Sequence, residues 1–230
     1  RRRLARAMEL TQQARAEAGS TEGAPVALDA ALVARYRAAM RDAVAFTRGT
    51  TQISIADADG NLASLTLSNG EGTGYLLPGT GIMMNNMLGE QDLNPTGFQR
   101  WPLNQRISSM MCPTLVAHAH GGWTVTGSSG SNRIRSAILQ VLCNIIDLDL
   151  PLDEAVAAPR IHLEDGRLSI EPPVDRHVLA ALARDWPDLL AFREPSVFFG
   201  GAHSVAIDAN GRLSGAGDLR RGGVVRRVQG

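Results

Sequence analysis

The 230-residue chain contains no lysine, and its 23 arginines are balanced by 23 acidic residues, so the formal net charge is +0. A balanced charge provides no general attraction to phosphate backbones or anionic lipid surfaces, which argues against a nucleic-acid partner or a membrane-surface partner. The apolar runs are also far shorter than the roughly 20 residues that a membrane-spanning helix requires. We therefore expect no nucleic-acid partner and no membrane span in this chain.

Several residue patterns of common active sites are also missing. The only two cysteines, Cys112 and Cys143, stand in apolar segments without a CxxC or ligand spacing, which predicts buried free thiols. His118 and His120 would share one face of a strand, but no third ligand follows at a suitable spacing, so we expect no metal site. The other histidines lack a GxSxG motif, and "NGEGTG" lacks the GK[ST] ending of a phosphate loop. A histidine-based triad and a nucleotide site are therefore not predicted.

The hydrophobic content of 44% over 230 residues can bury one substantial core, so we expect one main domain. Apolar residues at helical spacing predict two helices before residue 50, over 2–17 and 28–46, with Asp29 as a candidate cap of the second. From Thr50 the pattern changes to strict alternation. The alternation predicts a hairpin with strands over 51–57 and 62–68.

The remaining chain mixes short strands with helices. The glycine-rich segment 69–81 is too apolar in its middle for a free linker and predicts a bound loop near a site. Because the strands come as antiparallel hairpins and the helices in separate groups, the pattern predicts an α+β layering and not a parallel βαβ series. The predicted elements are strands over 107–119 and 122–128, a helix over 132–147 with a buried stripe of Ile134, Ile138, Leu142 and Ile145, a short helix over 151–159, a hairpin over 160–171, a helix over 175–186, and a strand and hairpin over 195–218.

The junction Gly49-Thr50-Thr51 in "FTRGTTQISIADADGN" has two interpretations. Threonine favours strands and glycine ends whatever precedes it, so the junction is explained as an ordinary strand start. Alternatively, Thr50 becomes a new N-terminus, and its hydroxyl and its own α-amino group act together as nucleophile and base. The residues of the junction alone do not decide between the two.

A second stretch, "VTGSSGSNRIRSAIL" over 125–139, predicts a strand that ends in a turn of small residues and feeds directly into an amphipathic helix. Unpaired amides at such a helix start suit an oxyanion or a carboxylate. The alternative is an ordinary helix start that is capped by Ser131 or Asn132.

Taken in order, "GTTQISIADADGN", "GTGIMMNNMLGE", "SSMMCPTLV", "VTGSSGSNR" and "APRIH" resemble the small catalytic subunit of the gamma-glutamyltranspeptidase family, from Gly49 to about Gly223. The resemblance implies the four-layered αββα fold of N-terminal nucleophile hydrolases and a precursor that cuts itself before a threonine. It places the cut between Gly49 and Thr50. Residues 1–49 would then be the end of the large subunit and residues 50–230 the small catalytic subunit.

The resemblance also implies roles for individual residues. Thr50 becomes the nucleophile, with its freed α-amino group as base, and Thr51 is the alternative nucleophile that we disfavour. Ser68 stands where the family has a threonine that supports the nucleophile. The remaining residues carried over are Asn69, Ser108 and Ser109 for the substrate carboxylate, Glu90 for the substrate amino group, and Gly130 and Ser131 for the oxyanion hole.

Met87 and Glu90 depart from the family pattern. Better-known members have Gln or Glu at the position of Met87 and Asp at the position of Glu90. A lost hydrogen-bond partner for a buried amine costs about 1–3 kcal/mol, so the donor need not be glutathione. We expect transfer or hydrolysis of a γ-glutamyl amide without a cofactor, with the large subunit as partner and a periplasmic or extracellular location by resemblance. The alternatives are an acylase acting on β-lactam side chains or poly-γ-glutamate, and an inactive scaffolding paralogue. The 230-residue chain alone is expected to be nearly inactive.

Overall fold

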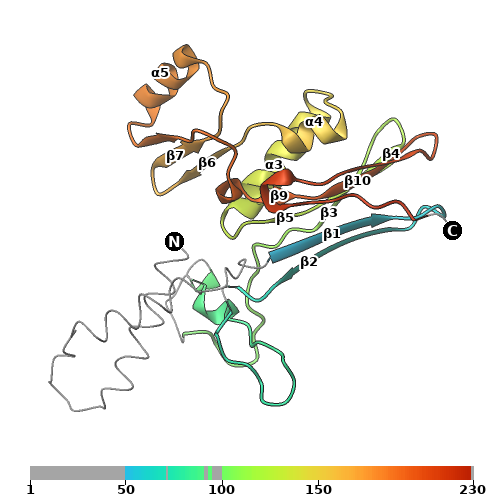
Figure 1. Ribbon diagram of the computed structural model, residues 1–230, viewed down its shortest axis with the longest axis vertical. Coiled ribbons are helices and arrows are strands. Elements are labelled where there is room, and N and C mark those ends of the chain that lie inside the picture. The colour runs from blue at the N-terminus through green and yellow to red at the C-terminus, as the bar shows by residue number, and fades with distance from the viewer. Residues whose placement is uncertain (1–49, 71, 91–92, 95–99, 229–230) are drawn as a thin grey trace, which may run out of the picture. The chain divides into compact units, whose positions relative to one another are not determined.

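The computed structural model describes residues 50–70, 72–90, 93–94 and 100–228 (Figure 1). The helices predicted over 2–17 and 28–46, with the Asp29 cap, and the junction residue Gly49 lie outside the described residues. The first described elements are the strands β1 (Thr50–Ala56) and β2 (Leu62–Ser68), which pair antiparallel with Thr50 opposite Ser68. The predicted hairpin is therefore confirmed.

A four-stranded antiparallel sheet forms the next layer, in the order β11-β10-β4-β3. A short ribbon of β5 and β9 continues from it. The strands are β3 (Thr114–Ala117), β4 (Gly122–Thr126), β5 (Ser128–Ser129), β9 (Gly201–Ala202), β10 (Ser204–Asp208) and β11 (Leu213–Ala216). Figure 1 shows this sheet between the hairpin β1–β2 on one side and two helices on the other.

The strand predicted over 107–119 is wrong in its first half, since β3 begins only at Thr114. The Ser109 hydroxyl accepts the Met111 amide at 3.1 Å, and the Thr114 hydroxyl donates to the Cys112 carbonyl at 2.8 Å. Such local side-chain bonds offer the backbone an alternative to strand pairing. Cys112 is exposed and Cys143 half-buried, and both are free thiols, so the predicted burial is wrong for Cys112.

Helices α3 (Arg133–Ile146) and α4 (Leu152–Ala157) cover the sheet. Their apolar core consists of Val141, Val156, Ala202 and Ala216, with Ile145 and Leu152 packed against it. The predicted stripe of α3 is confirmed for Ile134 and Ile138, which are buried. Leu142 and Ile145 are only half-buried. The buried face of the helix also includes Ala137 and Val141, which were not predicted. The helix side of the sheet is therefore held mainly by apolar packing.

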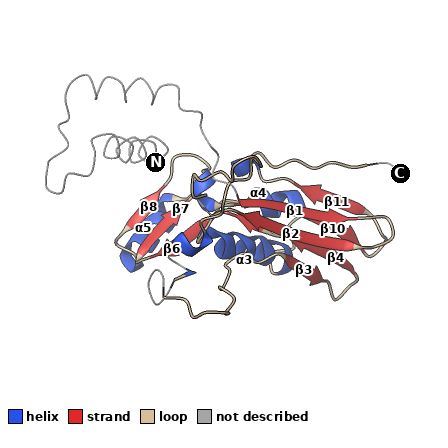
Figure 2. Ribbon diagram, turned by 90° about the horizontal axis from the view of Figure 1, so that it is seen from below, coloured by secondary structure: helices blue, strands red, loops and turns tan. Residues whose placement is uncertain are grey.

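A smaller sheet has the order β6-β7-β8 and carries helix α5 (Arg176–Asp185), with β6 (Ile161–Glu164), β7 (Arg167–Ile170) and β8 (Leu189–Ala191). Both views show β6, β7 and α5 grouped apart from the larger sheet (Figures 1 and 2). The hairpin predicted over 160–171 is confirmed. The expectation of antiparallel strands alone is wrong, because β8, which follows β7 in the chain after helix α5, pairs parallel to β7. A strand of three residues is too short to display an alternating pattern.

Neutral polar side chains fill the space between the hairpin and the larger sheet. Within the hairpin, the side-chain nitrogen of buried Gln52 donates to Ser54 and Ser64, and its side-chain oxygen accepts from Thr66. Two serines bond the hairpin to the strands beside it. Ser54 donates to the His203 carbonyl at 2.7 Å, and Ser64 donates to the Thr126 carbonyl at 2.8 Å. We call Gln52, Ser54, Ser64 and Thr66 the hydroxyl network. Strand alternation places Ile53, Ile55, Leu65 and Leu67 on the opposite, exposed face.

Buried charges hold the other side of the β5–β9 ribbon. Arg160 and Asp218 pair at 2.8 Å, with side chains only 2% and 1% exposed. Arg220 donates to Glu171 through Nε at 2.9 Å and through a terminal nitrogen at 2.7 Å. Asp218 also accepts the Ala202 amide of β9 at 2.9 Å. We call Arg160, Glu171, Asp218 and Arg220 the charge network, and it fixes β9 to the loops around it.

Candidate functional site

Thr50 stands at the first position of β1 and bonds directly to the end of β2. Its hydroxyl donates to Ser68 Oγ at 3.0 Å, and Ser68 Oγ accepts the Gly70 amide at 3.0 Å. Alternation places Thr50 on the same face of β1 as Gln52, toward the larger sheet, whereas Thr51 lies on the exposed face. The geometry therefore favours Thr50 over Thr51 as the reactive threonine.

Gly70 brings the Glu90 carboxylate to this pair. Its φ is +62°, and a Cβ placed on it would lie 2.9 Å from Glu90 Oε1 and 3.2 Å from the Asn86 carbonyl oxygen. Only glycine occupies this conformation and this space without strain. Sequence reasoning missed Gly70, although the Asn-Gly pair directly after a strand is a signal for a positive φ.

Asn69 contributes its backbone to the site region. Its carbonyl accepts the amides of Gly72 at 3.0 Å and Asn86 at 2.8 Å, and the second bond holds Asn69 against the segment that leads to Glu90. The Asn69 side chain is on the exposed surface. Its role toward a substrate carboxylate stays a prediction.

Glu90 follows the short 3-10 turn η1 (Met87–Gly89), and the Glu90 amide donates to the Met87 carbonyl at 3.1 Å. The side-chain amide of buried Asn94 donates to the Glu90 carbonyl at 2.7 Å and to the Leu88 carbonyl at 2.8 Å. Trp101 Nε1 in turn donates to Asn94 Oδ1 at 3.0 Å. Asn94 thus fixes the backbone that carries the Glu90 carboxylate, and no local sequence signal reveals this role.

The turn at Gly130 and Ser131 joins β5 to α3. Both residues have positive φ, +133° and +53°. The amide of Arg133 donates to the Gly130 carbonyl at 3.1 Å and that of Ile134 to the Ser131 carbonyl at 3.0 Å. Asn132 is the N-cap residue, and its side chain makes no capping bond. The amides of Gly130 and Ser131 precede the helix and stand outside its ladder of hydrogen bonds, which suits an anion.

The candidate oxyanion turn and Thr50 belong to elements that pack together, since β1 contacts β5. A Cβ placed on Gly127 would lie 2.2 Å from Gln52 Oε1, so the Gln52 side chain lies directly against the residue before β5. Among the described residues, no hydrogen bond joins exposed Ser108 or Ser109 to Thr50, and their role also stays a prediction.

A histidine and a glutamate lie beside the turn. Asn132 Nδ2 donates to Glu164 Oε1, Glu164 Oε2 is 3.4 Å from His162 Nε2, and His162 Nδ1 is 2.9 Å from Ser136 Oγ. The Ser136 hydroxyl lies 3.1 Å from the Arg133 carbonyl as well, and the direction of its bond to His162 Nδ1 depends on the histidine tautomer. Burial lowers the pKa of His162 and outweighs the neighbouring Glu164 carboxylate. The bonds of Asn132 to Glu164 and of Ser136 to His162 tie the start of α3 to β6.

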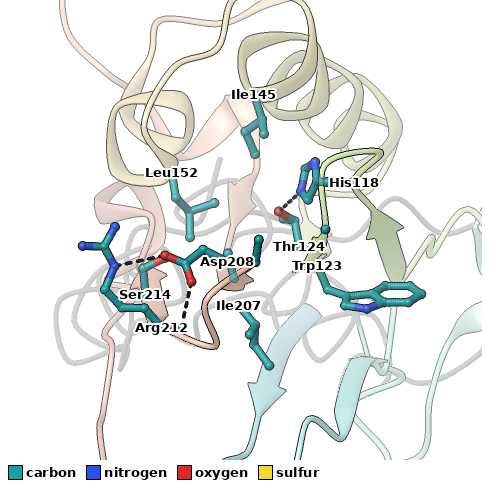
Figure 3. A pocket seen from close by; sticks show the side chains of 12 residues that line it. His118, Trp123, Thr124, Ile145, Leu152, Ile207, Asp208, Arg212 and Ser214 are labelled. Carbon is teal, nitrogen blue, oxygen red and sulfur yellow. Dashed lines mark hydrogen bonds and ion pairs between the residues drawn. The ribbon is translucent and has the colours of Figure 1, made fainter.

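A cavity of about 330 Å³ opens at the opposite end of β4, near its turn with β3 (Figure 3). Four of its polar side chains form two pairs, His118 with Thr124 at 2.8 Å and Asp208 with Arg212 at 3.2 Å. It offers no evident reactive group. Within the described residues no three potential metal ligands gather, and no helix among them is long and apolar enough to cross a membrane.

Comparisons with known proteins find relatives over most of the chain. The sequence matches the gamma-glutamyltranspeptidase family over residues 5–228. It is 32% identical to the acylase ACY 1 proenzyme of Pseudomonas sp. (strain SE83), over 79% of this chain and 32% of that protein. It is also 32% identical to the glutathione hydrolase proenzyme of Escherichia coli (strain K12), over 74% of this chain and 31% of that protein.

Among solved structures, the gamma-glutamyltranspeptidase from Pseudomonas nitroreducens complexed with L-DON superposes with a TM-score of 0.66 at 27% identity. The match covers 78% of this chain and 100% of that chain. The chain spans about a third of the length of the two proenzymes, which are 32% and 31% covered.

Proposed function

The chain belongs to the gamma-glutamyltranspeptidase family, and we propose that it is the catalytic part of a precursor that cuts itself between Gly49 and Thr50 and then transfers or hydrolyses γ-glutamyl amides. The fold is the α+β fold of the N-terminal nucleophile hydrolases, as the motifs predicted. Residues 1–49 are the end of the large subunit in this proposal, and residues 50–230 are the small subunit.

The bond between Thr50 and Ser68 carries the proposal. A threonine hydroxyl is a poor nucleophile at neutral pH, so it needs a base and a fixed orientation. Ser68 holds the Thr50 oxygen at 3.0 Å on the face of β1 that looks toward the larger sheet. Once the bond to Gly49 is cut, the α-amino group of Thr50, with an ordinary pKa near 8, supplies the base from the same residue.

The proposed reaction has two halves. The Thr50 oxygen attacks the γ-carbonyl carbon and its proton passes to the α-amino group, while the developing oxyanion is bound by the amides of Gly130 and Ser131. The intermediate then expels the amine, which takes the proton, and leaves an ester on Thr50. Water or an acceptor amine attacks this ester and restores the Thr50 hydroxyl.

The lengths of the chains support a cut at Thr50. Residues 50–230 make up about 79% of the sequence, and the match that covers the whole chain of the Pseudomonas nitroreducens structure covers 78% of this chain.

Glu90 is the proposed contact for the substrate amino group, because its carboxylate lies over Gly70 next to Ser68. Ser108 and Ser109 are the proposed contacts for the substrate α-carboxylate. Half-buried Met87, whose carbonyl accepts the Glu90 amide, offers no hydrogen bond to an ammonium group. This apolar neighbour favours a second candidate function, an acylase whose donor lacks the glutamyl ammonium, and the 32% identity to the ACY 1 proenzyme points the same way.

The test is autoproteolysis and turnover of the full-length precursor that contains this chain. The unchanged precursor should give two fragments that meet at Gly49 and Thr50 by intact mass, and it should hydrolyse a chromogenic γ-glutamyl anilide. Thr50→Ala should stay uncut and lose at least about 1000-fold in turnover, as expected for loss of a nucleophile. Thr51→Ala is the matched control, and it should cut and turn over.

The outcomes separate the alternatives. Cleavage of Thr50→Ala at the same bond would show that Thr50 is not the nucleophile. A precursor that cuts but prefers an aliphatic or β-lactam side-chain amide to the γ-glutamyl anilide supports the acylase. A precursor that neither cuts nor turns over supports the inactive paralogue.

A further inference from the structure

Ser129, one residue before the candidate oxyanion turn, has a buried hydroxyl without a partner. The residue is 1% exposed, and among the described residues its Oγ forms no hydrogen bond. Neighbouring Ser128 is equally buried, but its Oγ donates to the Ser129 carbonyl at 2.9 Å and accepts the Gly201 amide at 3.3 Å. Buried hydroxyls are nearly always bonded, because leaving one unpaired costs its lost hydration. The Ser129 hydroxyl is therefore a buried group whose hydrogen-bonding capacity none of the described residues meets.

The two serines face opposite layers. A Cβ placed on Gly200 would lie 3.1 Å from Ser128 Oγ and 3.3 Å from Ala137 of α3, so Ser128 faces the helix side. A Cβ placed on Gly127 would instead meet the Gln52 side chain of β1. Side chains alternate along an extended chain, so Ser129 faces the same layer as Gly127. Its hydroxyl is thus directed toward β1, which packs against β5, and toward the side chain of Arg221, which covers Gly201, the residue opposite Ser129.

The polar side chains on that face of β1 already have partners. Gln52 is bonded to Ser54, Ser64 and Thr66. The Thr50 hydroxyl donates to Ser68. The proposed function creates one further polar group on this strand, the α-amino group that Thr50 gains when its bond to Gly49 is cut.

We propose, on the basis of the proposed function, that Ser129 is a positioning residue whose hydroxyl accepts a hydrogen bond from the freed α-amino group of Thr50. The bond turns the lone pair of the amine toward the hydroxyl of Thr50, from which it takes the proton. No covalent bond forms or breaks at Ser129. An accepted N–H bond favours the protonated amine, so the hydroxyl raises the pKa of the α-amino group.

The experiment compares Ser129→Ala and Ser129→Thr with the matched control Ser128→Ala, all in the full-length precursor. Ser129→Ala should still cut, but its kcat should fall about 10-fold with KM changed less than about 2-fold, the pattern of a lost general-base contribution. The acid limb of its kcat/KM profile should move to lower pH by about half a unit, because the amine loses an acceptor. Ser129→Thr keeps the hydroxyl and should restore both values.

A second readout separates positioning from stability. In the uncut Thr50→Ala precursor, Ser128→Ala should lower Tm by about 2–4 °C, because it removes two hydrogen bonds of the ribbon. Ser129→Ala should leave Tm unchanged or raise it in the same background, since its hydroxyl has no partner there.

Three results would overturn the role of Ser129 while leaving Thr50 in place. These are an unchanged kcat and pH profile in Ser129→Ala, a Tm loss in Ser129→Ala equal to that of Ser128→Ala, and failure of Ser129→Ala to fold. Cleavage of Thr50→Ala would remove the proposed function first and the role of Ser129 with it.

Discussion

The hydroxyl network and the charge network flank the same ribbon, β5–β9, with opposite chemistry. The hydroxyl network uses neutral groups, such as Ser64 donating to the Thr126 carbonyl at 2.8 Å. The charge network uses full charges, such as Arg160 and Asp218 at 2.8 Å, with almost no exposure. A buried charge pair is costly to assemble and costly to break, so it fixes a backbone. A hydroxyl rotates and exchanges partners at low cost, so it suits a site where protons move. We therefore expect the charge network to fix the ribbon, whereas the proposed chemistry lies on the side of the hydroxyl network.

The largest expected effect is loss of stability on the charged side. Asp218→Asn leaves the Arg160 guanidinium 2% exposed without its partner carboxylate, and breaking a buried pair costs about 3–5 kcal/mol. Burial already lowers the pKa of Arg160 against the opposing effect of Asp218. Urea unfolding of the uncut full-length precursor measures the loss.

The control for this prediction is Asp208→Asn, whose carboxylate is more exposed and pairs with exposed Arg212 at 3.2 Å. An exposed pair contributes at most about 1 kcal/mol. If both variants lose the same stability, the charge network is not the rigid side of the ribbon, and the comparison fails.

A smaller effect is expected from pH, through a histidine that touches both networks. The backbone carbonyl of His203 accepts a hydrogen bond from the Ser54 hydroxyl at 2.7 Å, and the Nδ1 atom of its ring accepts one from the backbone amide of Asp218 at 3.2 Å. Burial lowers the pKa of His203, and the nearby Asp218 carboxylate only partly opposes this. The folded protein therefore binds the proton less readily than the unfolded chain. Stability should fall as pH drops below about 6.5, by at most about 1.4 kcal/mol per pH unit, until the folded-state pKa is reached.

His203→Asn tests this, because an amide oxygen replaces Nδ1 as acceptor and does not titrate. Unfolding free energies at several pH values between 7.5 and 5 should fall less steeply for the variant than for the unchanged chain. Equal slopes would mean that His203 has the same pKa in the folded and unfolded states, and that the loss of stability at low pH comes from other titrating groups.

The sequence predicted the elements whose signals are local. The alternation predicted both strands of the first hairpin, but β1 runs one residue earlier than predicted, from Thr50 to Ala56, and this shift places Thr50 opposite Ser68. The Asp165-Gly166 turn likewise predicted the hairpin of β6 and β7, and both residues have positive φ. Parallel pairing of β8 depends on a contact with a distant strand and leaves no local pattern.

The candidate site was predictable only in part. Thr50, Ser68, Gly130 and Ser131 stand in motifs that can be read along the chain. Asn94 and Glu164 act through contacts made by folding, such as the bond from Asn132 to Glu164 over 32 positions. A buried hydroxyl without a partner, as in Ser129, is visible only when its surroundings are known.

The smallest expected effect concerns Ser131, on the side of the ribbon assigned to chemistry. Its φ of +53° is a left-handed conformation that costs a residue with a side chain about 1 kcal/mol, and glycine adopts it freely. Ser131→Gly should therefore raise stability by roughly 0.5 kcal/mol, since the unfolded chain also gains freedom. Turnover should change less than about 2-fold, because the proposed oxyanion contact uses the amide and not the side chain.

Ser131→Ala completes this test, because it keeps the Cβ and the strained conformation but removes the bond from Ser131 Oγ to Asn132 Oδ1 at 3.3 Å. It should be no more stable than the unchanged chain, which separates relief of backbone strain from loss of the hydroxyl. If both variants lose turnover by a similar factor above about 10, the hydroxyl itself takes part in the reaction. The chemistry at this turn would then rest on a side chain as well as on backbone amides, and a side chain would act here as is proposed for Thr50 and Ser68.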